Sequence, residues 1–248
     1  MHLDVFFAAD QLTTGDTASR VVAVIDVLRA STTIAVALAN GARNIIPFDS
    51  TEEVILRSKA FERGSVRLAG ERKMLAVPGF DFGNSPREFS HAAVDGKTVL
   101  FSTTNGTVAL VAVQGARDVV VASYVNFTAV ATLLRTALRG GTDVAIVCAG
   151  RERQFSLEDA ACAGRYVRHL LDFDGTLQLN DAARAALEIE RGFADDVARL
   201  FTESAHGRAL REAGFVEDLA LCAALDAYPV IPVYSDRQIT KLGPERER

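Results

Sequence analysis

The sequence predicts an α/β protein with three layers in the order α/β/α, a mixed and largely parallel sheet, and a helical C-terminal part. Strand-like and helix-like segments alternate along much of the chain, which is typical of such a sheet. The segment Val21–Val27 is apolar and β-branched, as strands buried on both faces are. The segments that start at Ser31 and Asn105 align without a gap, which indicates duplication of a βαβ unit, unless two ordinary units resemble each other by chance.

Four strands are predicted in the first part of the chain, at Leu3–Ala8, Val21–Val27, Asn44–Phe48 and Val66–Ala69. Ser31 is a favoured N-cap residue, and it predicts a helix that ends at Gly41. Ser50 and Glu53 form the capping box of the next helix. The stretch Val77–Pro86 is dense in Gly, Pro, Asn and Asp, so it is predicted to be a loop of fixed shape.

The second part of the chain repeats this pattern before the helical C-terminal part begins. Its elements include strands at Thr98–Ser102 and Thr142–Val147, and helices at Asn126–Leu138 and Ser156–Leu171. A last strand is predicted at Val230–Tyr234. We interpret residues 1–248 as a single compact α/β unit, with two similar subdomains of about 1–95 and 96–248 as the alternative.

The composition argues against several classes of protein. A net charge of −5 disfavours a broad nucleic-acid surface, which needs clustered Lys and Arg. No apolar run approaches the ~20 residues that span a bilayer, and the apolar start is too short for a signal peptide. The three cysteines cannot all pair and lack the spacing of zinc ligands. We therefore expect a cytoplasmic protein that binds neither nucleic acid nor membrane, with a homodimer as the common default.

The strongest candidate site lies at the end of the strand that begins at residue 21. Asp26 interrupts an apolar strand end, and a buried acid is costly unless it is hydrogen-bonded, paired or bound to a metal. Ligands of open parallel sheets collect at the carboxyl ends of strands and at the N-termini of the following helices. Asp26, Arg29 and the amides of Ser31, Thr32 and Thr33 fall there. This group suits a phosphate ester and a divalent metal, although Ser31 alone suits a helix cap.

The duplication predicts a second contributor to this site. The polar turn Thr103–Thr107 follows its strand as the first polar turn follows its own, so the two turns should share one pocket. Taken alone, Asn105 and Gly106 also suit an ordinary tight turn, and Glu158 and Asp159 suit the first turn of a helix.

Other catalytic patterns find little support. Asp172–Thr176 (DFDGT) matches the haloacid-dehalogenase phosphatase signature DxDGT, but it continues a helical pattern instead of following a buried strand, so we interpret it as a link between helices. Cys148 resembles the cysteine of tyrosine phosphatases, yet Arg153 comes one position too early for CxxxxxR. The four histidines, His206 among them, stand in no catalytic pattern. The chain also lacks GxSxG, Walker and GxGxxG motifs, which speaks against ATP and NAD.

Five stretches together carry a resemblance to a known family. They are VIDVLRASTT, LAGER, GFDFGNSP, TTNGT and CAGRERQFSLED. In this order, from Asp26 to Asp159, they resemble the 2-phosphosulfolactate phosphatase family, with a fainter echo in ESAHGRALREAGFVEDLALCAALD. Ser31 stands where the family pattern has Thr, Phe82 stands where it has Leu, and the loop Arg151–Gln154 lacks a glycine.

The resemblance implies a magnesium-dependent phosphatase that converts 2-phospho-3-sulfolactate, or a related 2-phospho-acid, to sulfolactate and phosphate, a step towards coenzyme M where that cofactor is made. The implied catalytic residues are Asp26, Arg29, Glu71 and Arg72, and the implied Mg²⁺ ligands come from Asp26, Glu71, Glu158 and Asp159. The implied substrate-binding residues are Ser31, Thr32, Thr33, Asn84, Ser85, Thr104, Asn105, Gly106 and Thr107. Direct attack by Asp26 and attack by metal-activated water are both open.

Other functions also suit this scaffold and a small anionic phosphorylated ligand. A non-catalytic or regulatory anion-binding module would bind phosphate or sulfolactate without releasing phosphate. An isomerase or phosphotransferase would leave a changed or phosphorylated organic product. A dehalogenase-like phosphatase would depend on the DFDGT stretch instead of Asp26.

Overall fold

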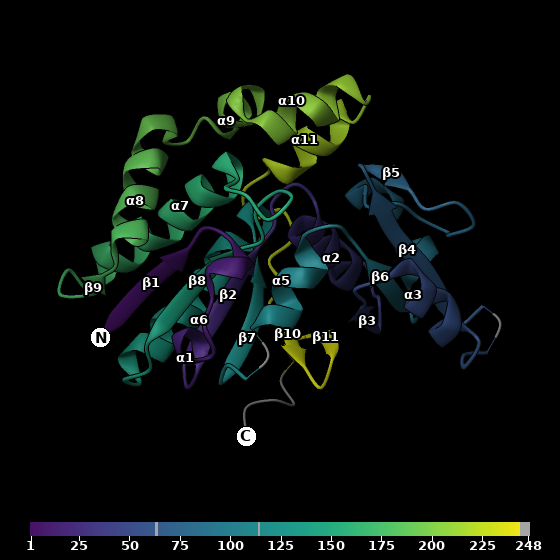
Figure 1. Cartoon of the computed structure of the whole chain (residues 1–248), viewed down its shortest axis with the longest axis horizontal. Coiled ribbons are helices and arrows are strands. Elements are labelled where there is room, and N and C mark those ends of the chain that lie inside the picture. Colours follow the sequence, from purple (N-terminus) through teal and green to yellow (C-terminus); the bar gives the residue numbers. More distant parts are fainter. Residues whose placement is uncertain (63, 114, 244–248) are drawn as a thin grey trace.

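The computed structural model describes residues 1–62, 64–113 and 115–243. Within these residues an open sheet of eleven strands carries helices on both faces, so the predicted α/β class is confirmed (Figure 1). The strands are β1 (His2–Phe6), β2 (Val21–Ile25), β3 (Asn44–Pro47), β4 (Val66–Arg72), β5 (Leu75–Ala76), β6 (Thr98–Ser102), β7 (Asp118–Ala122), β8 (Val144–Cys148), β9 (Gln178–Leu179), β10 (Pro232–Ser235) and β11 (Gln238–Lys241). The helices are α1 (Thr14–Thr17), α2 (Ala30–Ala39), α3 (Thr51–Ser58), α4 (His91–Val94), α5 (Gly106–Ala112), α6 (Phe127–Arg139), α7 (Leu157–Phe173), α8 (Asp181–Phe193), α9 (Val197–Glu203), α10 (Ala205–Glu212) and α11 (Val216–Cys222).

The sheet consists of two parallel parts joined by an antiparallel hairpin. Its strand order is β5-β4-β6-β3-β11-β10-β7-β2-β8-β1-β9. Strands β4, β6 and β3 run parallel, as do β7, β2, β8, β1 and β9, whereas β10 and β11 pair antiparallel with each other and with β7 and β3. The short edge strand β5 pairs antiparallel with β4. Figure 1 shows the two parallel parts on the left and right, with the β10–β11 hairpin between them at the bottom. The sheet is therefore mixed and largely parallel, as predicted.

The element order shows the predicted duplication. Both β2-α2-β3-α3-β4 and β6-α5-β7-α6-β8 are βαβαβ units, and reversing the sheet order about the β11–β10 hairpin exchanges β3 with β7, β6 with β2 and β4 with β8. Each unit's first strand lies in the other unit's part of the sheet, because β2 pairs with β7 and β8 while β6 pairs with β3 and β4. The two copies follow one another in sequence but interleave in space.

Sheet twist brings the ends of β2 and β6 together. The two strands run in opposite directions across the sheet, because three of the five steps between them are antiparallel. At about 20–25° per step the sheet turns by roughly 100–125° between them, and this turn swings their carboxyl ends towards each other. The first residues of the helices that follow, Ala30 of α2 and Gly106 of α5, face each other, since a Cβ atom on Gly106 would lie 2.6 Å from the Cβ of Ala30. Each is the first residue of the helix that follows its copy's first strand, so a pseudo-twofold axis that relates the two copies passes near this contact. The predicted proximity of the two polar turns is confirmed.

A hydrophobic core lies on each face of the sheet. Val21, Ala23 and Ile25 of β2 join the core with α6, α7 and α8, whereas Val22 and Val24 join the core with α2 and α5. All five are buried, as the apolar and β-branched sequence of this strand predicts. Full burial of a Val or Ile side chain contributes about 1.5–3 kcal/mol. Strand β2 is therefore a firm base for the turn that follows it.

Two local predictions differ from the structure. Helix α2 begins at Ala30 with Arg29 as its N-cap, so Ser31 lies inside the first turn, where its hydroxyl accepts a hydrogen bond from Asp26 N–H at 2.8 Å. The last predicted strand, β10, pairs with a further strand, β11, that the sequence did not predict. Asp236 and Arg237 form their turn at φ values of 53° and 61° without a glycine, so the usual hairpin signal is missing.

Helices α9, α10 and α11 lie across the top of the molecule in Figure 1, above the ends of the strands. They bring residues from the last quarter of the chain to the site, which the sequence pattern alone does not indicate. In the described part of the chain, no helix combines the length and the apolar character needed to cross a membrane.

Candidate active site

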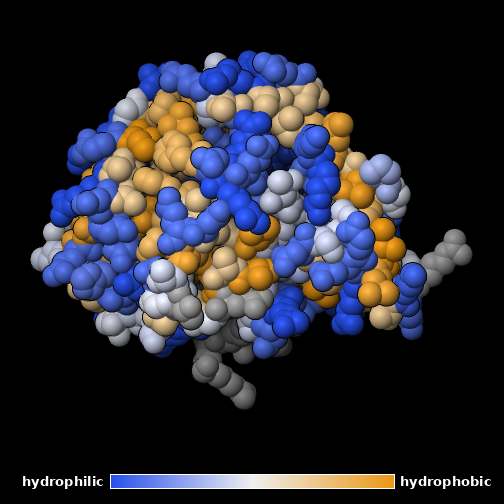
Figure 2. Space-filling view, viewed as in Figure 1, coloured by the Kyte–Doolittle hydropathy of each residue, from blue (hydrophilic) through white to orange (hydrophobic). Residues whose placement is uncertain are grey.

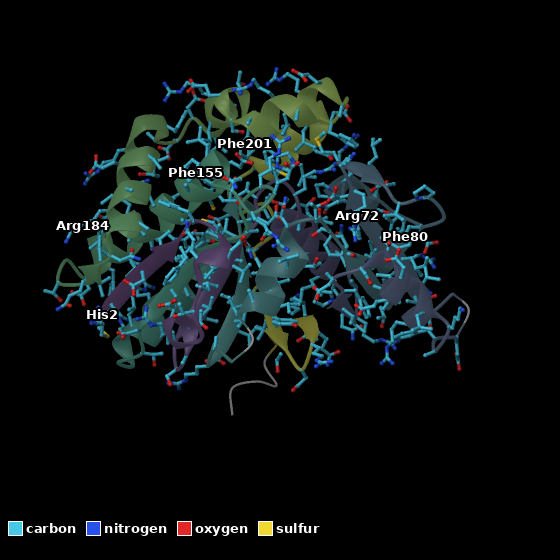
Figure 3. The ribbon with its side chains drawn as sticks, viewed as in Figure 1. His2, Arg72, Phe80, Phe155, Arg184 and Phe201 are labelled. Carbon is cyan, nitrogen blue, oxygen red and sulfur yellow. The ribbon has the colours of Figure 1, made fainter. Side chains whose placement is uncertain are left out.

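A pocket of about 530 Å³ lies where residues that follow β2, β6 and β8 meet the end of β4. Figure 2 shows hydrophilic surface gathered in the centre of this view, below α9–α11, and Figure 3 shows Arg72 near the upper end of β4. The pocket is lined by Asp26, Leu28 and Arg29 after β2, Glu71 and Arg72 at the end of β4, Lys73 and Met74 in the turn after β4, Asn84 in the loop after β5, Thr104 and Asn105 after β6, Arg151 and Glu152 after β8, and His206 of α10.

Asp26 is the acid that stands out in this pocket. It is 5% exposed, and its carboxylate has no ion pair among the described residues, although it accepts a hydrogen bond from Ala30 N–H. Burial raises the pKa of Asp26 from 3.8 to about 6, the charge of His206 opposes this rise, and the negative charge of Glu71 adds to it. Buried, unpaired acids of this kind often belong to functional sites, because their cost must be offset by a bound ligand.

Gly106 explains why the second turn can come so close to Asp26. A Cβ atom at this position would lie 2.8 Å from Asp26 Oδ2, so any other residue would displace the carboxylate or the start of α5. The glycine predicted as a substrate-binding residue therefore has a packing role in the structure, where it lets the two copies meet at the pocket.

Glu71 and Arg72 fix the end of β4 to the second turn. Glu71 Oε1 accepts a hydrogen bond from Thr104 N–H at 2.9 Å, and Oε2 accepts one from Met74 N–H at 2.8 Å. Arg72 donates to Ser102 Oγ at 2.9 Å and to Ser102 O at 3.3 Å, at the end of β6. Glu71 and Arg72 thus line the pocket and also hold its two walls together.

Arg29 belongs to a buried ion pair. Its Nη1 lies 2.7 Å from Asp218 Oδ2 of α11, and both side chains are 2% exposed. The guanidinium also donates to Met74 O at 2.8 Å and lies 4.3 Å from the ring centroid of Phe215. Ser85 Oγ donates to the other oxygen of Asp218 at 2.6 Å. Arg29 and Ser85, both predicted site residues, therefore meet through an acid that the sequence analysis did not single out.

The first turn of α7 brings two more acids to the site. Asp159 accepts hydrogen bonds from Val27 N–H at 2.9 Å and from Gly150 N–H at 3.2 Å, so both its oxygens hold the loops after β2 and β8. Burial raises the pKa of Asp159 well above its usual value, and the charge of Asp26 adds to this rise. Glu158 Oε1 lies 3.4 Å from His206 Nδ1. Burial raises the pKa of Glu158, but hydrogen bonding and the charge of His206 lower it further than burial raises it.

Most of the predicted substrate-binding hydroxyls are bound to the backbone. Thr32 Oγ1 donates to Val27 O at 3.0 Å, Thr33 Oγ1 donates to Asn84 O at 3.0 Å, and Thr107 Oγ1 donates to Thr103 O at 2.9 Å. The predicted anion-holding amides of Thr33 and Thr107 also have protein acceptors, Arg29 O at 2.9 Å and Thr103 Oγ1 at 3.3 Å. These groups shape the turns, and a substrate-binding role for them stays a prediction.

Two asparagines line the pocket in different ways. Asn84 is 4% exposed, and its Oδ1 is buried without a hydrogen-bond partner among the described residues. Asn105 Oδ1 accepts a hydrogen bond from Glu152 N–H at 3.0 Å, which ties the turn after β6 to the turn after β8. Asn84 therefore has spare hydrogen-bonding capacity at the pocket, whereas Asn105 connects two of its walls.

The residues fit a magnesium ion only if few protein carboxylates bind it. Within the described ranges, no three His, Cys, Asp or Glu side chains are grouped as a metal site. Both oxygens of Glu71 and of Asp159 already accept backbone hydrogen bonds, and Glu158 faces His206. Mg²⁺ often takes one or two protein carboxylates and completes its coordination with phosphate oxygens and water. Asp26 suits that arrangement as the single protein carboxylate.

Three residues at the site, His206, Asp218 and Arg151, carry no local sequence pattern that singles them out. His206 and Asp218 lie in the helical C-terminal part, far along the chain from the motifs they contact. The only sequence feature that points to them is the weak resemblance to the family in the stretch ESAHGRALREAGFVED, which contains both residues. Arg151 lies within the motif CAGRERQFSLED, where only the acids had been chosen.

The DFDGT stretch lies away from this pocket. Asp172 is exposed in the last turn of α7, and Asp174 Oδ1 accepts hydrogen bonds from Thr176 N–H at 2.9 Å and Thr176 Oγ1 at 2.6 Å. The stretch follows a helix and leads to β9, so it links a helix to a short strand instead of linking two helices.

The fold and the pocket together define a class of protein, an α/β protein with a pocket of buried acids and arginines at the junction of two duplicated units. A family model described as 2-phosphosulpholactate phosphatase matches residues 6–237. The chain is 42% identical over 225 residues to a protein of Symbiobacterium thermophilum, which covers 91% of this chain and 95% of the relative. It is 40% identical over 232 residues to a protein of Carboxydothermus hydrogenoformans, which covers 94% of this chain and 92% of the relative.

A protein of Caldanaerobacter subterraneus is 36% identical over 235 residues, which cover 94% of this chain and 95% of the relative. All three relatives bear the name "Probable 2-phosphosulfolactate phosphatase". The chain belongs to the 2-phosphosulfolactate phosphatase family, and it is a phosphoric monoester hydrolase. The family that the five motifs resemble is thereby confirmed.

Proposed function

We propose that this protein hydrolyses 2-phospho-3-sulfolactate, or a closely related 2-phospho-acid, to sulfolactate and phosphate, with Mg²⁺ as its cofactor. The observation that supports this function best is Asp26, a buried acid that has no ion pair with any residue the structure describes, in a pocket also lined by arginines and polar turns. The family and the names of the relatives support the choice of substrate.

In the proposed reaction a water oxygen becomes bonded to phosphorus, the ester P–O bond breaks, and the C2 oxygen of sulfolactate takes up a proton. Phosphate monoesters resist hydrolysis strongly, and enzymes accelerate it chiefly by positioning and charge neutralisation. A bound Mg²⁺ would supply positive charge to the phosphate oxygens. Asp26 either holds this ion or attacks phosphorus itself, after which water hydrolyses the aspartyl phosphate.

His206 is the side chain best suited to the proton transfer. It lines the pocket, and its electrostatic effect on Asp26 indicates that the two side chains are neighbours. Glu158, a buried acid 3.4 Å from Nδ1, would orient the imidazole, as acids orient histidines in many hydrolases. In this role His206 gives its proton to the C2 oxygen as the ester bond breaks.

A phosphate-release assay tests the function. The purified protein is incubated with 2-phospho-3-sulfolactate, 2-phospholactate and an aryl phosphate, each with Mg²⁺ and with EDTA. We expect release from 2-phospho-3-sulfolactate to be fastest, and to stop with EDTA and return when Mg²⁺ is restored. Binding of sulfolactate without phosphate release from any substrate would contradict the proposal and favour a module that only binds anions.

A second measurement separates the two roles of Asp26. In a single turnover stopped with acid, mass spectrometry should find a phosphorylated peptide that contains Asp26 if this residue attacks phosphorus. If water attacks, the intact protein carries no phosphate at any time, and calorimetry should instead show that Mg²⁺ affinity depends on Asp26.

A further inference from the structure

Lysine and arginine contribute four basic side chains to the pocket lining, and they differ in whether they have an ion pair or hydrogen bonds within the protein. Arg29 is paired with Asp218 and covered by Phe215. Arg72 donates hydrogen bonds to the oxygens of Ser102. The charge of Arg29 is largely balanced inside the protein, whereas the other two basic residues, Lys73 and Arg151, have no ion pair among the described residues.

Of these two basic residues, Arg151 has the backbone that is held more firmly by hydrogen bonds. Its side chain is half-buried, and its guanidinium has neither a hydrogen bond nor an ion pair in the described part of the chain. Its backbone exchanges two hydrogen bonds with Gln154, at 2.9 and 2.8 Å. Gly150 before it has a φ of 70°, a conformation that permits the tight turn after β8. Lys73, by contrast, is exposed on a flexible stem.

The turn that carries Arg151 is also tied to its surroundings on both sides. The next residue, Glu152, donates its N–H to Asn105 Oδ1 at 3.0 Å, which joins this turn to the turn after β6. At its other end Phe155 packs against Phe7, with ring centroids 5.2 Å apart (Figure 3 labels Phe155). The backbone of the loop that carries Arg151 is therefore held in place on both sides, so less conformational entropy is lost when Arg151 binds an anion.

Arg151 lies within reach of a ligand held at Asp26. Ile25 and Cys148 are paired across the neighbouring strands β2 and β8, and Ala149 N–H donates to Ile25 O at 2.7 Å. Neighbouring strands are about 4.8 Å apart, so Asp26 and the loop with Arg151 begin side by side at one edge of the sheet. A small ligand with its phosphate at Asp26 would place its other groups towards this loop.

We propose that Arg151 binds an acid group of the substrate other than the phosphate, and that it thereby selects 2-phospho-acids over simple phosphate esters. This inference rests on the proposed function. A guanidinium offers two parallel N–H groups that match the oxygens of a carboxylate or a sulfonate, and an arginine without an internal partner is free to do so. The substrate arms of the test distinguish the carboxylate from the sulfonate.

Arg151→Ala tests the proposal, and Arg153→Ala is its matched control. Arg153 lies in the same loop but is exposed and does not line the pocket. Steady-state kinetics are measured for both variants with 2-phospho-3-sulfolactate, 2-phospholactate and an aryl phosphate. In Arg151→Ala we expect KM for 2-phospho-3-sulfolactate to rise about 10- to 100-fold, as for loss of a charge-assisted contact, while the aryl phosphate changes by less than about threefold.

The three substrates identify the group that Arg151 binds. A loss confined to 2-phospho-3-sulfolactate places Arg151 on the sulfonate, and an equal loss with 2-phospholactate places it on the carboxylate. Arg151→Lys should fall between the wild type and Arg151→Ala, because an ammonium keeps the charge but loses the paired N–H groups. Arg153→Ala should resemble the wild type with every substrate.

Two results would overturn the proposal. An equal loss with the aryl phosphate would mean that Arg151 acts on the phosphoryl group or on the fold, and no loss with any substrate would return it to an ordinary surface charge. Both outcomes differ from failure of the proposed function itself, in which the unmodified protein releases no phosphate from 2-phospho-acids. Circular dichroism and thermal melting of each variant check that its fold is intact.

Discussion

The two copies of the βαβαβ unit share a backbone plan but supply different parts of the pocket. Directly after its first strand, the first copy has Asp26 where the second has Thr103. At the N-cap of the next helix, the first copy has Arg29 and the second has Asn105. The first copy thus places an acid and an arginine where the second places neutral polar residues.

The residues at the end of β4 and after β8 extend this contrast. In the first copy Glu71 and Arg72 follow Gly70, and both are bonded to residues of the second copy, Thr104 and Ser102. In the second copy Gly150 precedes Arg151, whose side chain is open to the pocket. Under the proposals above, one copy would carry the chemical step while the other would close the pocket and recognise the ligand. Duplication makes this division possible because the pseudo-twofold axis brings equivalent turns to one site.

The largest expected effect is that of Asp26→Asn. The change keeps the size of the side chain but removes the charge that holds a metal ion or attacks phosphorus, so phosphate release should fall by at least about 10³-fold. Thr103→Ser, at the equivalent position of the second copy, should keep activity within about threefold, because the hydroxyl that pairs with Thr107 is retained. A similar loss in both variants would break the division between the copies. Phosphate release at saturating substrate is the measurement.

Glu71→Gln should have the next largest effect. The carboxylate accepts one backbone hydrogen bond with each oxygen, whereas an amide side chain can accept only with its single oxygen. One part-buried N–H, of Met74 or Thr104, would lose its carboxylate partner, so we expect a loss of about 1–3 kcal/mol in the free energy of unfolding and a roughly 10- to 100-fold drop in kcat/KM. Denaturant unfolding and kinetics measure the two effects. Glu62→Gln, at an exposed acid whose side chain has no hydrogen bond or ion pair among the described residues, is the control and should change neither.

Arg72→Lys should cost roughly tenfold in kcat/KM, more than its unchanged charge suggests. The guanidinium reaches both oxygens of Ser102 and also Glu71 O at 2.8 Å, a set of contacts that one ammonium cannot copy. Because these contacts organise the pocket wall, we expect equal losses with 2-phospho-acids and with an aryl phosphate. Losses restricted to 2-phospho-acids would instead mean that Arg72, like Arg151, binds an acid group of the substrate. Ligand recognition would then come from both copies and not from the second copy alone.

The charge of Asp26 should also appear in the stability of the protein. Its folded pKa of about 6 lies above the ordinary value of 3.8, so the ionised form is disfavoured in the fold and costs stability at neutral pH. This cost, on the order of 2–3 kcal/mol, should fade as the pH falls from about 6 to 4 and Asp26 takes up its proton. In EDTA, Asp26→Asn should therefore melt higher than the wild type at pH 7.5 and similarly at pH 4.5. Equal melting temperatures at both pH values would contradict the buried, unpaired state of Asp26.

The sequence predicts those features that a local pattern carries. The apolar strand β2, the acid at its end and the repeated turns are all visible in short segments, and the structure has them at the expected places. Contacts between distant segments carry no such pattern. The ion pair between Arg29 and Asp218 joins residues 189 positions apart, and nothing in either segment indicates the other.

The sequence also identifies candidate acids without showing which of them accept hydrogen bonds from the protein itself and which stay available to a ligand. Glu71, Glu158 and Asp159 were natural candidates for metal ligands, but hydrogen bonds from backbone amides occupy both oxygens of Glu71 and Asp159. Such bonds depend on how the loops meet, and the meeting of the loops depends on sheet twist and on the close approach at Gly106. A motif thus locates the site, while the tertiary arrangement decides the part that each residue plays in it.

The smallest expected effect is that of Asp172→Asn, at the end of α7 far from both copies' turns. Helix α7 has 17 residues, and Asp172 comes 13 residues after Asp159, so at about 1.5 Å per residue it lies roughly 20 Å along the axis from the turn with Glu158 and Asp159. Asp172 is exposed, so the change should alter the free energy of unfolding by no more than about 0.5 kcal/mol and leave kcat/KM within about twofold. Kinetics and thermal melting of the variant measure both effects. A loss of several orders of magnitude in an intact fold would show that the reaction depends on DFDGT, and the division of labour between the two copies would then describe a binding site and not the place of catalysis.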